Sequence, residues 1–146
     1  MHFEGTTLIA APRDRVYAFL MDPDQVGPCG PGVESIEVVD GTHYKARAKV
    51  GIGFISARFL VNMEVAEQEP PVRAVMKAHG QAPGSIVDAT AEMQLSDDGD
   101  GATRMDWEAD VTISGAIAGV GARLIEGTAN KMIAQSFDCI RTRLEA

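Results

Sequence analysis

The run ISARFLVNMEV, residues 55–65, alternates apolar and polar side chains along most of its length. One phase of the run is apolar throughout: Ile55, Ala57, Phe59, Val61, Met63 and Val65. The other phase holds the polar side chains Ser56, Arg58, Asn62 and Glu64. Because successive side chains of a strand point to opposite faces, this pattern predicts a strand with one buried and one solvated face.

The segments on either side of this run repeat its pattern. Alternating stretches occupy residues 33–39, 44–50, 72–78, 87–95 and 105–113. Turn-forming residues separate the stretches: Asp40-Gly41, Gly51 with Gly53, Pro70-Pro71, and the tract 97–101. Half-buried strands joined by such turns are typical of an antiparallel meander.

The N-terminal residues predict a strand followed by a short helix. Residues 3–10 are expected to form the strand, and Pro12 suits the first turn of a helix, where its missing N–H is not needed. The apolar spacing of residues 16–20 is helical and ends at Asp22-Pro23. Residues 27–32, with three glycines and two prolines, predict a tight irregular loop.

The period becomes helical again after Gly115. Two apolar stripes follow, the first made of Ile117, Val120 and Leu124, the second of Met132, Ile133, Phe137, Ile140 and Leu144. At about 100° per residue the stripes are rotated by roughly a third of a turn from each other. Either the helix kinks near Gly127, or the sheet wraps far enough to cover both stripes.

Together these elements predict one α+β domain spanning residues 1–146, a length sufficient for a single core. We expect a helix-grip arrangement, in which a curved antiparallel sheet of six to seven strands wraps around a long C-terminal helix. One or two short helices are expected after the first strand.

The overall charge and the chain termini exclude several classes of protein. A net charge of -8 repels phosphate backbones, so we expect no nucleic-acid partner. No apolar stretch reaches the ~20 residues of a membrane span, and the N-terminus does not resemble a signal peptide. We therefore expect a cytoplasmic protein, in which Cys29 and Cys139 are buried reduced thiols.

The expected inner face of the sheet is unusually rich in small residues: Ala46, Ala48, Ala57, Ala74, Ala78, Ala89, Ala91 and Ala109. The start of the last helix, residues 115–122, is also rich in glycine and alanine. Small residues on both sides leave either a close helix–sheet approach or a pocket. Large adaptable residues on the same phase, such as Met76 and Met93, favour an apolar ligand pocket.

We expect this pocket to be lined by side chains from the inner phase of the strands and from the last helix. The predicted ligand-binding residues are Tyr44, Ala57, Phe59, Met76, Ala91, Met93, Trp107, Ala109, Ile117, Val120 and Leu124. The loop 27–32 and Gly51–Gly53 are expected to rim its mouth.

Residues suited to catalysis are not expected to converge in this pocket. His43 and His79 fall on the polar phase of their strands, and His2 is next to the terminus. No serine occupies a Gly-x-Ser-x-Gly motif, and no Cys/His group has metal-ligand spacing. We therefore expect no catalytic residue, no metal and no cofactor.

Several short motifs, in this order and spacing, resemble the carbon monoxide dehydrogenase G-subunit family of START-like proteins over nearly the whole chain. They are Phe3-Glu4-Gly5, Ala11-Pro12, Asp22-Pro23, Cys29-Gly30-Pro31-Gly32-Val33-Glu34, Ser114-Gly115-Ala116-Ile117-Ala118 and Gly121-Ala122-Arg123-Leu124-Ile125.

This resemblance implies a non-catalytic accessory or carrier protein that binds a hydrophobic small molecule, lipid or quinone-like, and is associated with a molybdenum hydroxylase. Family members are linked to membrane recruitment through a C-terminal tail; here Glu145-Ala146 directly follow the predicted helix, so we expect no tail, and peripheral contact with the inner membrane face stays open. The alternative is an enzyme of the polyketide cyclase or hydratase type, a chemistry that related folds host.

Overall fold

The computed structural model describes residues 1–146 and contains one seven-stranded, fully antiparallel sheet of order β1-β7-β6-β5-β4-β3-β2. The strands are β1 (His2–Ile9), β2 (Val33–Val38), β3 (His43–Ile52), β4 (Ile55–Glu69), β5 (Arg73–Ala82), β6 (Ser85–Asp97) and β7 (Thr103–Gly115). The helices are α1 (Arg13–Leu20), α2 (Pro23–Val26), η1 (Gly27–Cys29), η2 (Ala116–Val120) and α3 (Ala122–Glu145), where η1 and η2 are 3₁₀ helices.

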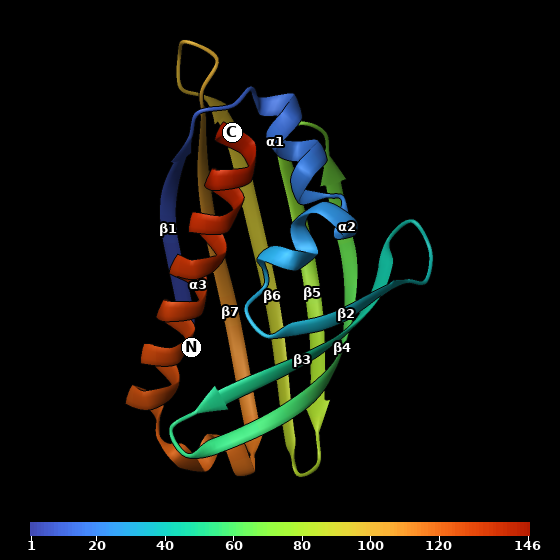
Figure 1. Ribbon diagram of the computed structural model, residues 1–146, viewed down its shortest axis with the longest axis vertical. Helices are drawn as coiled ribbons and strands as arrows, with labels where there is room; N and C mark the ends of the chain where they lie inside the picture. The colour runs from blue at the N-terminus through green and yellow to red at the C-terminus, as the bar shows by residue number, and fades with distance from the viewer.

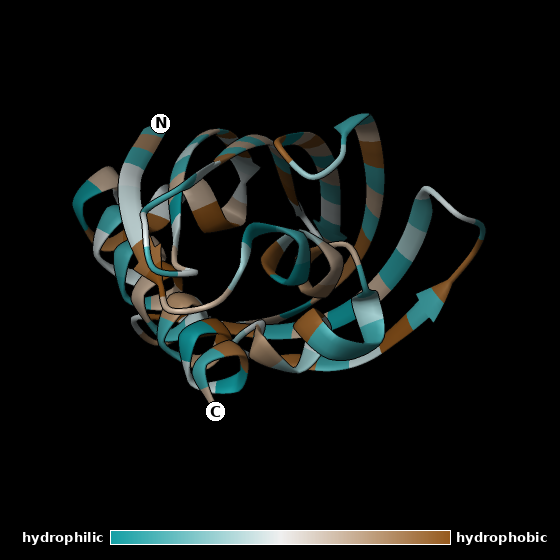
Figure 2. Ribbon diagram, turned by 90° about the horizontal axis from the view of Figure 1, so that it is seen from above, coloured by the Kyte–Doolittle hydropathy of each residue, from teal (hydrophilic) through white to brown (hydrophobic).

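The sheet curves around α3, which runs along its concave side (Figure 1). Viewed from above, the strands form an arc and the helices lie on its open side (Figure 2). The short helices α1 and α2 cover the end of the concave side where α3 finishes. The predicted α+β helix-grip fold is thus confirmed, with short helices after β1 and the long helix last. No helix combines the length and the apolar character needed to cross a lipid bilayer.

Of the two alternatives for the apolar stripes, an interruption near Gly127 does not occur, because α3 continues through that residue. The break occurs earlier, at Gly121, whose φ of 101° is a conformation that favours glycine. Before it, η2 is anchored to the β5–β6 turn: the Ala116 N–H donates to the Gly84 carbonyl at 2.8 Å, and the Ile117 N–H donates to Ser85 Oγ at 3.0 Å. Ile117 and Val120 of the first stripe therefore belong to η2, whereas Leu124 and the whole second stripe lie on α3.

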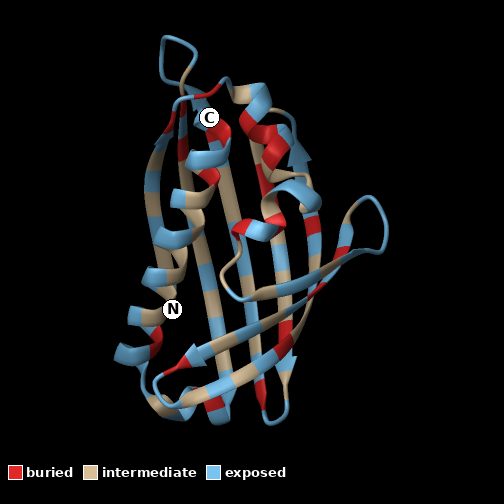
Figure 3. Ribbon diagram, viewed as in Figure 1, coloured by how far each residue is buried: buried red, intermediate tan, exposed pale blue.

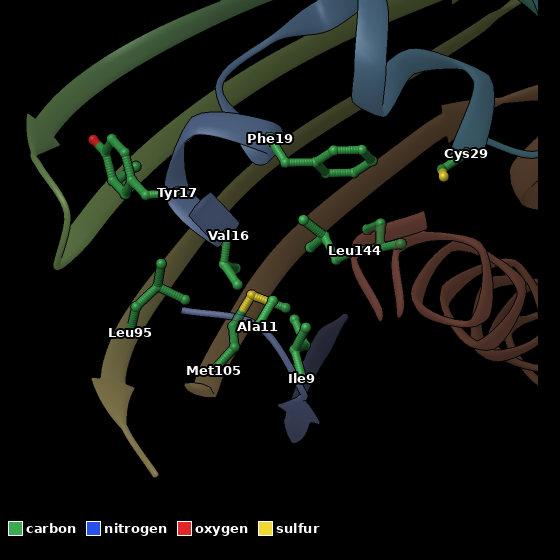
Figure 4. Close-up of a cluster of buried hydrophobic side chains, with 11 residues drawn as sticks. Ile9, Ala11, Val16, Tyr17, Phe19, Cys29, Leu95, Met105 and Leu144 are labelled. Carbon is green, nitrogen blue, oxygen red and sulfur yellow. The ribbon is translucent and has the colours of Figure 1, made fainter. Parts of the chain in front are cut away.

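Most of the buried apolar residues, 14 of 19, form two clusters rather than one continuous core. The larger, which we call the upper cluster, contains 11 buried residues, among them Ile9, Val16 and Leu144. Figure 4 shows side chains from β1, α1, β7 and α3 converging there. The lower cluster consists of Ile52, Phe59 and Ile117 at the other end of the sheet. Figure 3 shows buried residues mainly toward the two ends and partly exposed ones along the strands between them.

The expectation that Cys29 and Cys139 are reduced thiols is wrong. Their sulfurs are bonded to each other, and the two Cα atoms are 5.4 Å apart although 110 residues separate them in sequence. The physical reason is the packing of η1 against α3, which places the two side chains face to face. The disulfide fixes the loop before β2 to the long helix.

Candidate ligand-binding cavity

The inner face of the central strands brings together five of the predicted ligand-binding residues. In the strand register Met76 pairs with Ala91, and Ala91 pairs with Ala109. The adjacent inner pair is Met93 with Trp107. Four of these five residues are only half-buried, and Ala91 is exposed although it faces the helix side of the sheet. We call this area the central section.

The central section is accessible because α3 rests on the edges of the curved sheet. Its close backbone approaches are to β1, β3, η1, η2 and α1, and the central strands β5 and β6 have no comparable contact with it. Alanine side chains extend only one carbon from the backbone, so Ala89, Ala91 and Ala109 cannot fill the remaining distance. Native cores are normally packed to a density of about 0.75. The inner face between the two clusters therefore stays accessible to solvent.

Trp107 closes the central section toward the upper cluster. Its ring lies against the Phe137 ring of α3, with centroids 5.4 Å apart and planes tilted by 44°. It also covers Gly5 of β1, where an added Cβ would lie 2.8 Å from a ring carbon. Gly5 belongs to the Phe3-Glu4-Gly5 motif, and this contact gives a physical reason for a glycine at that position.

The other predicted residues lie nearer the lower cluster. Phe59 and Ile117 are part of it, and Ala57 and Val120 pack against it. Tyr44 is buried on β3, where its hydroxyl donates to the Gly41 carbonyl at 3.4 Å. These residues lie beside the central section, on the β3–β4 side and toward the lower cluster.

The prediction of Leu124 as an inner residue is wrong. Its side chain is 43% exposed and lines an outward groove with Val120 and Arg123. The inner position belongs to Ile125, which is 5% exposed. Counting back from Ile140 in helical intervals of three and four residues leads to Ile125, so the C-terminal stripe contained the signal. Ile125 was missed because Leu124 continues the spacing of the η2 stripe.

Two grooves lie beside α3, one toward β7 and one toward β3. One, of about 310 Å³, runs between β7 and the start of α3, and six of its seven lining residues are hydrophobic, including Val111, Ile113 and Ile125. The other, of about 250 Å³, lies between β3 and α3. Pro31, Gly32 and Gly51 line the second groove, so the two segments predicted to rim the mouth lie beside each other; that they form an entrance stays a prediction.

The side chains whose pKa values are shifted do not face the central section. At the β2–β3 turn, hydrogen bonds from the Thr42 backbone N–H and from the His43 ring lower the pKa of Asp40 to about 2, and Asp40 in turn raises the pKa of His43. Burial raises the pKa of Tyr17, whose hydroxyl donates to the Arg73 carbonyl at 3.3 Å. These groups stabilise turns and strand ends and do not face the central section.

The convex face of the sheet carries a separate acidic depression of about 540 Å³, with Glu4, Glu92 and Glu108 among its lining residues. His2, Glu4 and Glu108 place possible metal-binding atoms within 4.8 Å of one another there. However, the two ring nitrogens of His2 hydrogen-bond to Asp110 at 2.7 Å and to Glu4 at 3.3 Å, and these contacts raise the pKa of His2. They favour the protonated imidazole, which cannot bind a metal ion.

Comparison with solved structures identifies the same architecture in several bacterial proteins. A conserved protein from Geobacillus kaustophilus superposes with a TM-score of 0.93 at 23% identity, covering 99% of this chain and 95% of the other. A START superfamily protein from Mycobacterium smegmatis gives 0.74 at 12% identity, covering 99% and 97%. The aromatase/cyclase ZhuI from Streptomyces sp. R1128 gives 0.73 at 16% identity, covering 99% and 93%. At these identities the likeness concerns the fold.

No curated protein sequence matches the chain. The family model that describes the G subunit of carbon monoxide dehydrogenase (CoxG) matches residues 5–145 and thus includes every motif from Gly5 onward. The chain belongs to this carbon monoxide dehydrogenase G-subunit family, CoxG.

Proposed function

We propose that this protein is a non-catalytic carrier that holds one hydrophobic small molecule, lipid or quinone-like, between the central section and α3. The observation that carries the proposal is the exposure of Ala91 on the inner face, between two clusters that are themselves buried. Concave, mostly apolar interiors of this kind are where small molecules bind in proteins. The wall is a rigid antiparallel sheet, so the space persists without a ligand.

The chemistry of the inner face favours a neutral, largely apolar ligand. The inner phase of β5, β6 and β7 carries no ionisable side chain between the clusters. Met76 and Met93 have flexible thioether side chains that adapt to different ligand shapes. The tilted pair of Trp107 and Phe137 offers a flat aromatic surface to a ring, and a quinone ring fits this chemistry.

Family membership supports a role beside a carbon monoxide dehydrogenase-type molybdenum hydroxylase. In this role the protein carries the apolar molecule to or from the enzyme without taking part in the oxidation. A cytoplasmic location is part of the proposal. The Cys29–Cys139 bond argues against that location, because disulfides persist mainly in oxidising compartments.

The cyclase or hydratase alternative needs an acid or base that faces the ligand. Tyr44 is the one inward group with an ionisable side chain among the predicted site residues, and its hydroxyl is engaged with the Gly41 carbonyl. The similarity to ZhuI is a similarity of fold and carries no catalytic residue with it. A carrier therefore accounts for the inner face better than an enzyme does.

Titration with a short-tailed benzoquinone, followed through tryptophan fluorescence, tests the proposed function. Trp107 is the only tryptophan, and quinones quench indole emission on contact. We expect saturable quenching with a one-to-one stoichiometry, and a matching heat of binding in the Trp107→Phe variant, which keeps the aromatic wall. Linear, non-saturating quenching in the wild type together with no heat of binding would contradict a quinone-sized site.

A further inference from the structure

Residues 27–32, which we call the bridging loop, lie beside α3 on the concave side of the sheet (Figure 1). One end of this loop is fixed to the edge of the sheet, because the Lys49 N–H of β3 donates to the Gly32 carbonyl at 2.8 Å. The other end is fixed to the long helix by the Cys29–Cys139 disulfide. The bridging loop therefore connects β3 to α3, two elements that are far apart in the sequence.

The disulfide lies at one end of the groove between β3 and α3. Residues 31 and 32 of the bridging loop line one wall of this groove, and Thr128, Met132 and Gln135 of α3 line the other. Cys139 follows these helix residues at intervals of four, three and four, so it lies on the same face of α3. The bond thus joins the two walls of the groove directly.

Apart from the disulfide, the connections between the bridging loop and α3 are weak. A single hydrogen bond joins α3 to residues 22–32, in which Arg143 Nη1 donates to the Gln25 carbonyl at a long 3.5 Å. Cys29 is 4% exposed and belongs to the upper cluster, so its apolar contacts remain when the bond is broken. Reduction therefore removes the strongest connection between the groove walls and leaves the packing of the fold in place.

The bond is placed where a reductant can reach it, because Cys139 is only partly buried. A thiolate of a dithiol attacks Cys139 Sγ, the S–S bond breaks, and Cys29 Sγ leaves as a thiolate that takes up a proton. The second thiol of the reductant then displaces the Cys139 sulfur. The products are two protein thiols and the oxidised, cyclic dithiol, which has supplied both electrons. Accessible disulfides are typically the labile and regulatory ones.

We propose that the Cys29–Cys139 bond is a redox-controlled latch on the groove between β3 and α3. In the oxidised protein the bridging loop is held against α3, and after reduction by a dithiol it separates from the helix more often. This opening needs no ligand, but its use in controlling how fast an apolar molecule enters and leaves rests on the function proposed above. Neither cysteine belongs to the central section, so reduction should change the rates of exchange and leave the affinity unchanged.

Hydrogen exchange of the ligand-free protein, followed by mass spectrometry, tests the opening itself. After reduction with dithiothreitol we expect residues 27–32 and 128–139 to exchange about tenfold faster, because a cross-link of this kind strongly restricts local opening. The double variant Cys29→Ser, Cys139→Ser should match the reduced wild type, which excludes an effect of free thiols. The control is Val75→Ala, which removes buried methyl groups on the opposite face of β5 and destabilises the fold with the bond intact. It should keep the slow exchange of the bridging loop.

Stopped-flow binding of the neutral apolar dye N-phenylnaphthylamine tests the effect on a ligand. This dye contains no quinone that a thiol could reduce, and energy transfer from Trp107 reports its binding. The association and dissociation rate constants should both rise about tenfold on reduction, so the dissociation constant stays the same. Reoxidation with oxidised glutathione, which takes up the two electrons as two glutathione thiols, should restore the slow rates.

The outcomes separate the latch from the carrier function. Resistance of the bond to dithiothreitol in the folded protein, unchanged hydrogen exchange after reduction, or equal dye rates in the two states would overturn the latch and leave the carrier function standing. Acceleration in Val75→Ala as large as that in the reduced protein would also overturn it, because lost stability would then explain the effect. Absence of dye binding in both states, with faster hydrogen exchange on reduction, would contradict the carrier function and the role of the bond in ligand exchange.

Discussion

Two alanines on the same face of the sheet have different roles. Ala74 and Ala91 both lie on the inner phase of central strands. Ala74 is 1% exposed within the upper cluster, where larger buried side chains such as Tyr17 and Phe19 belong to the same packed core. Ala91 is exposed to the space under α3. The two interpretations of the alanine-rich face, close approach and pocket, therefore both occur, at different heights along the sheet.

Leucine substitutions at these two positions should have opposite consequences. At Ala74 the added atoms overpack a filled core, and we expect a loss of about 1–3 kcal/mol in the free energy of unfolding. At Ala91 the added atoms enter open space, so stability should stay equal or rise slightly. Urea unfolding of the two single variants measures the difference.

The two variants should also differ in their affinity for the ligand. Ala91→Leu takes up volume next to Met76 and Ala109, so the affinity for the benzoquinone should fall. Ala74→Leu should keep an affinity close to that of the wild type under conditions in which the variant is folded. A destabilisation of Ala91→Leu as large as that of Ala74→Leu would show that the central section is packed after all.

Among the structural elements, the alternating strands were predictable because each has one solvated and one buried face. The period of two in residues 55–65 reports this directly, and the structure places β4 over the same residues. The break at Gly121 was not predictable from the same kind of pattern. Both η2 and α3 have helical periods, and they are separated at Gly121, with a φ of 101°, after η2 has been anchored on the β5–β6 turn.

The disulfide could not be deduced from the sequence either. Cys29 and Cys139 lie in a loop and in the last helix, and their proximity depends on how α3 crosses the sheet. The same dependence explains the misplaced Leu124. Which of two neighbouring residues points inward is decided by where α3 starts, at Ala122.

Removing the cross-link should destabilise the fold without removing the cavity. Because it encloses 110 residues, the double variant Cys29→Ser, Cys139→Ser should lose about 2–4 kcal/mol in unfolding free energy. Denaturant unfolding measures this, and a reducing agent should lower the stability of the wild type by the same amount. Two free thiols in the native oxidised protein, or equal stability of the variant, would contradict the bond.

The whole molecule has a fold that needs little packing at its centre. Seven hydrogen-bonded strands and two apolar clusters stabilise the chain, so the centre of the sheet need not contribute a filled core. The sequence showed that the inner face is rich in alanine. Where along the strands these alanines lose contact with α3 depends on the distance between α3 and the sheet. That distance is set by contacts at the sheet edges, which the sequence does not display.

Native mass spectrometry of the freshly purified wild-type protein is the most direct test of a ligand-binding interior. We expect a fraction of molecules with the additional mass of one apolar molecule, and its loss in the double variant Ala91→Leu, Ala109→Leu, which should remain folded. Addition of lipid extract should restore the extra mass only in the wild type. If the wild type shows the bare chain mass before and after lipid extract, or if the double variant keeps the additional mass, the interior does not bind a ligand at the central section.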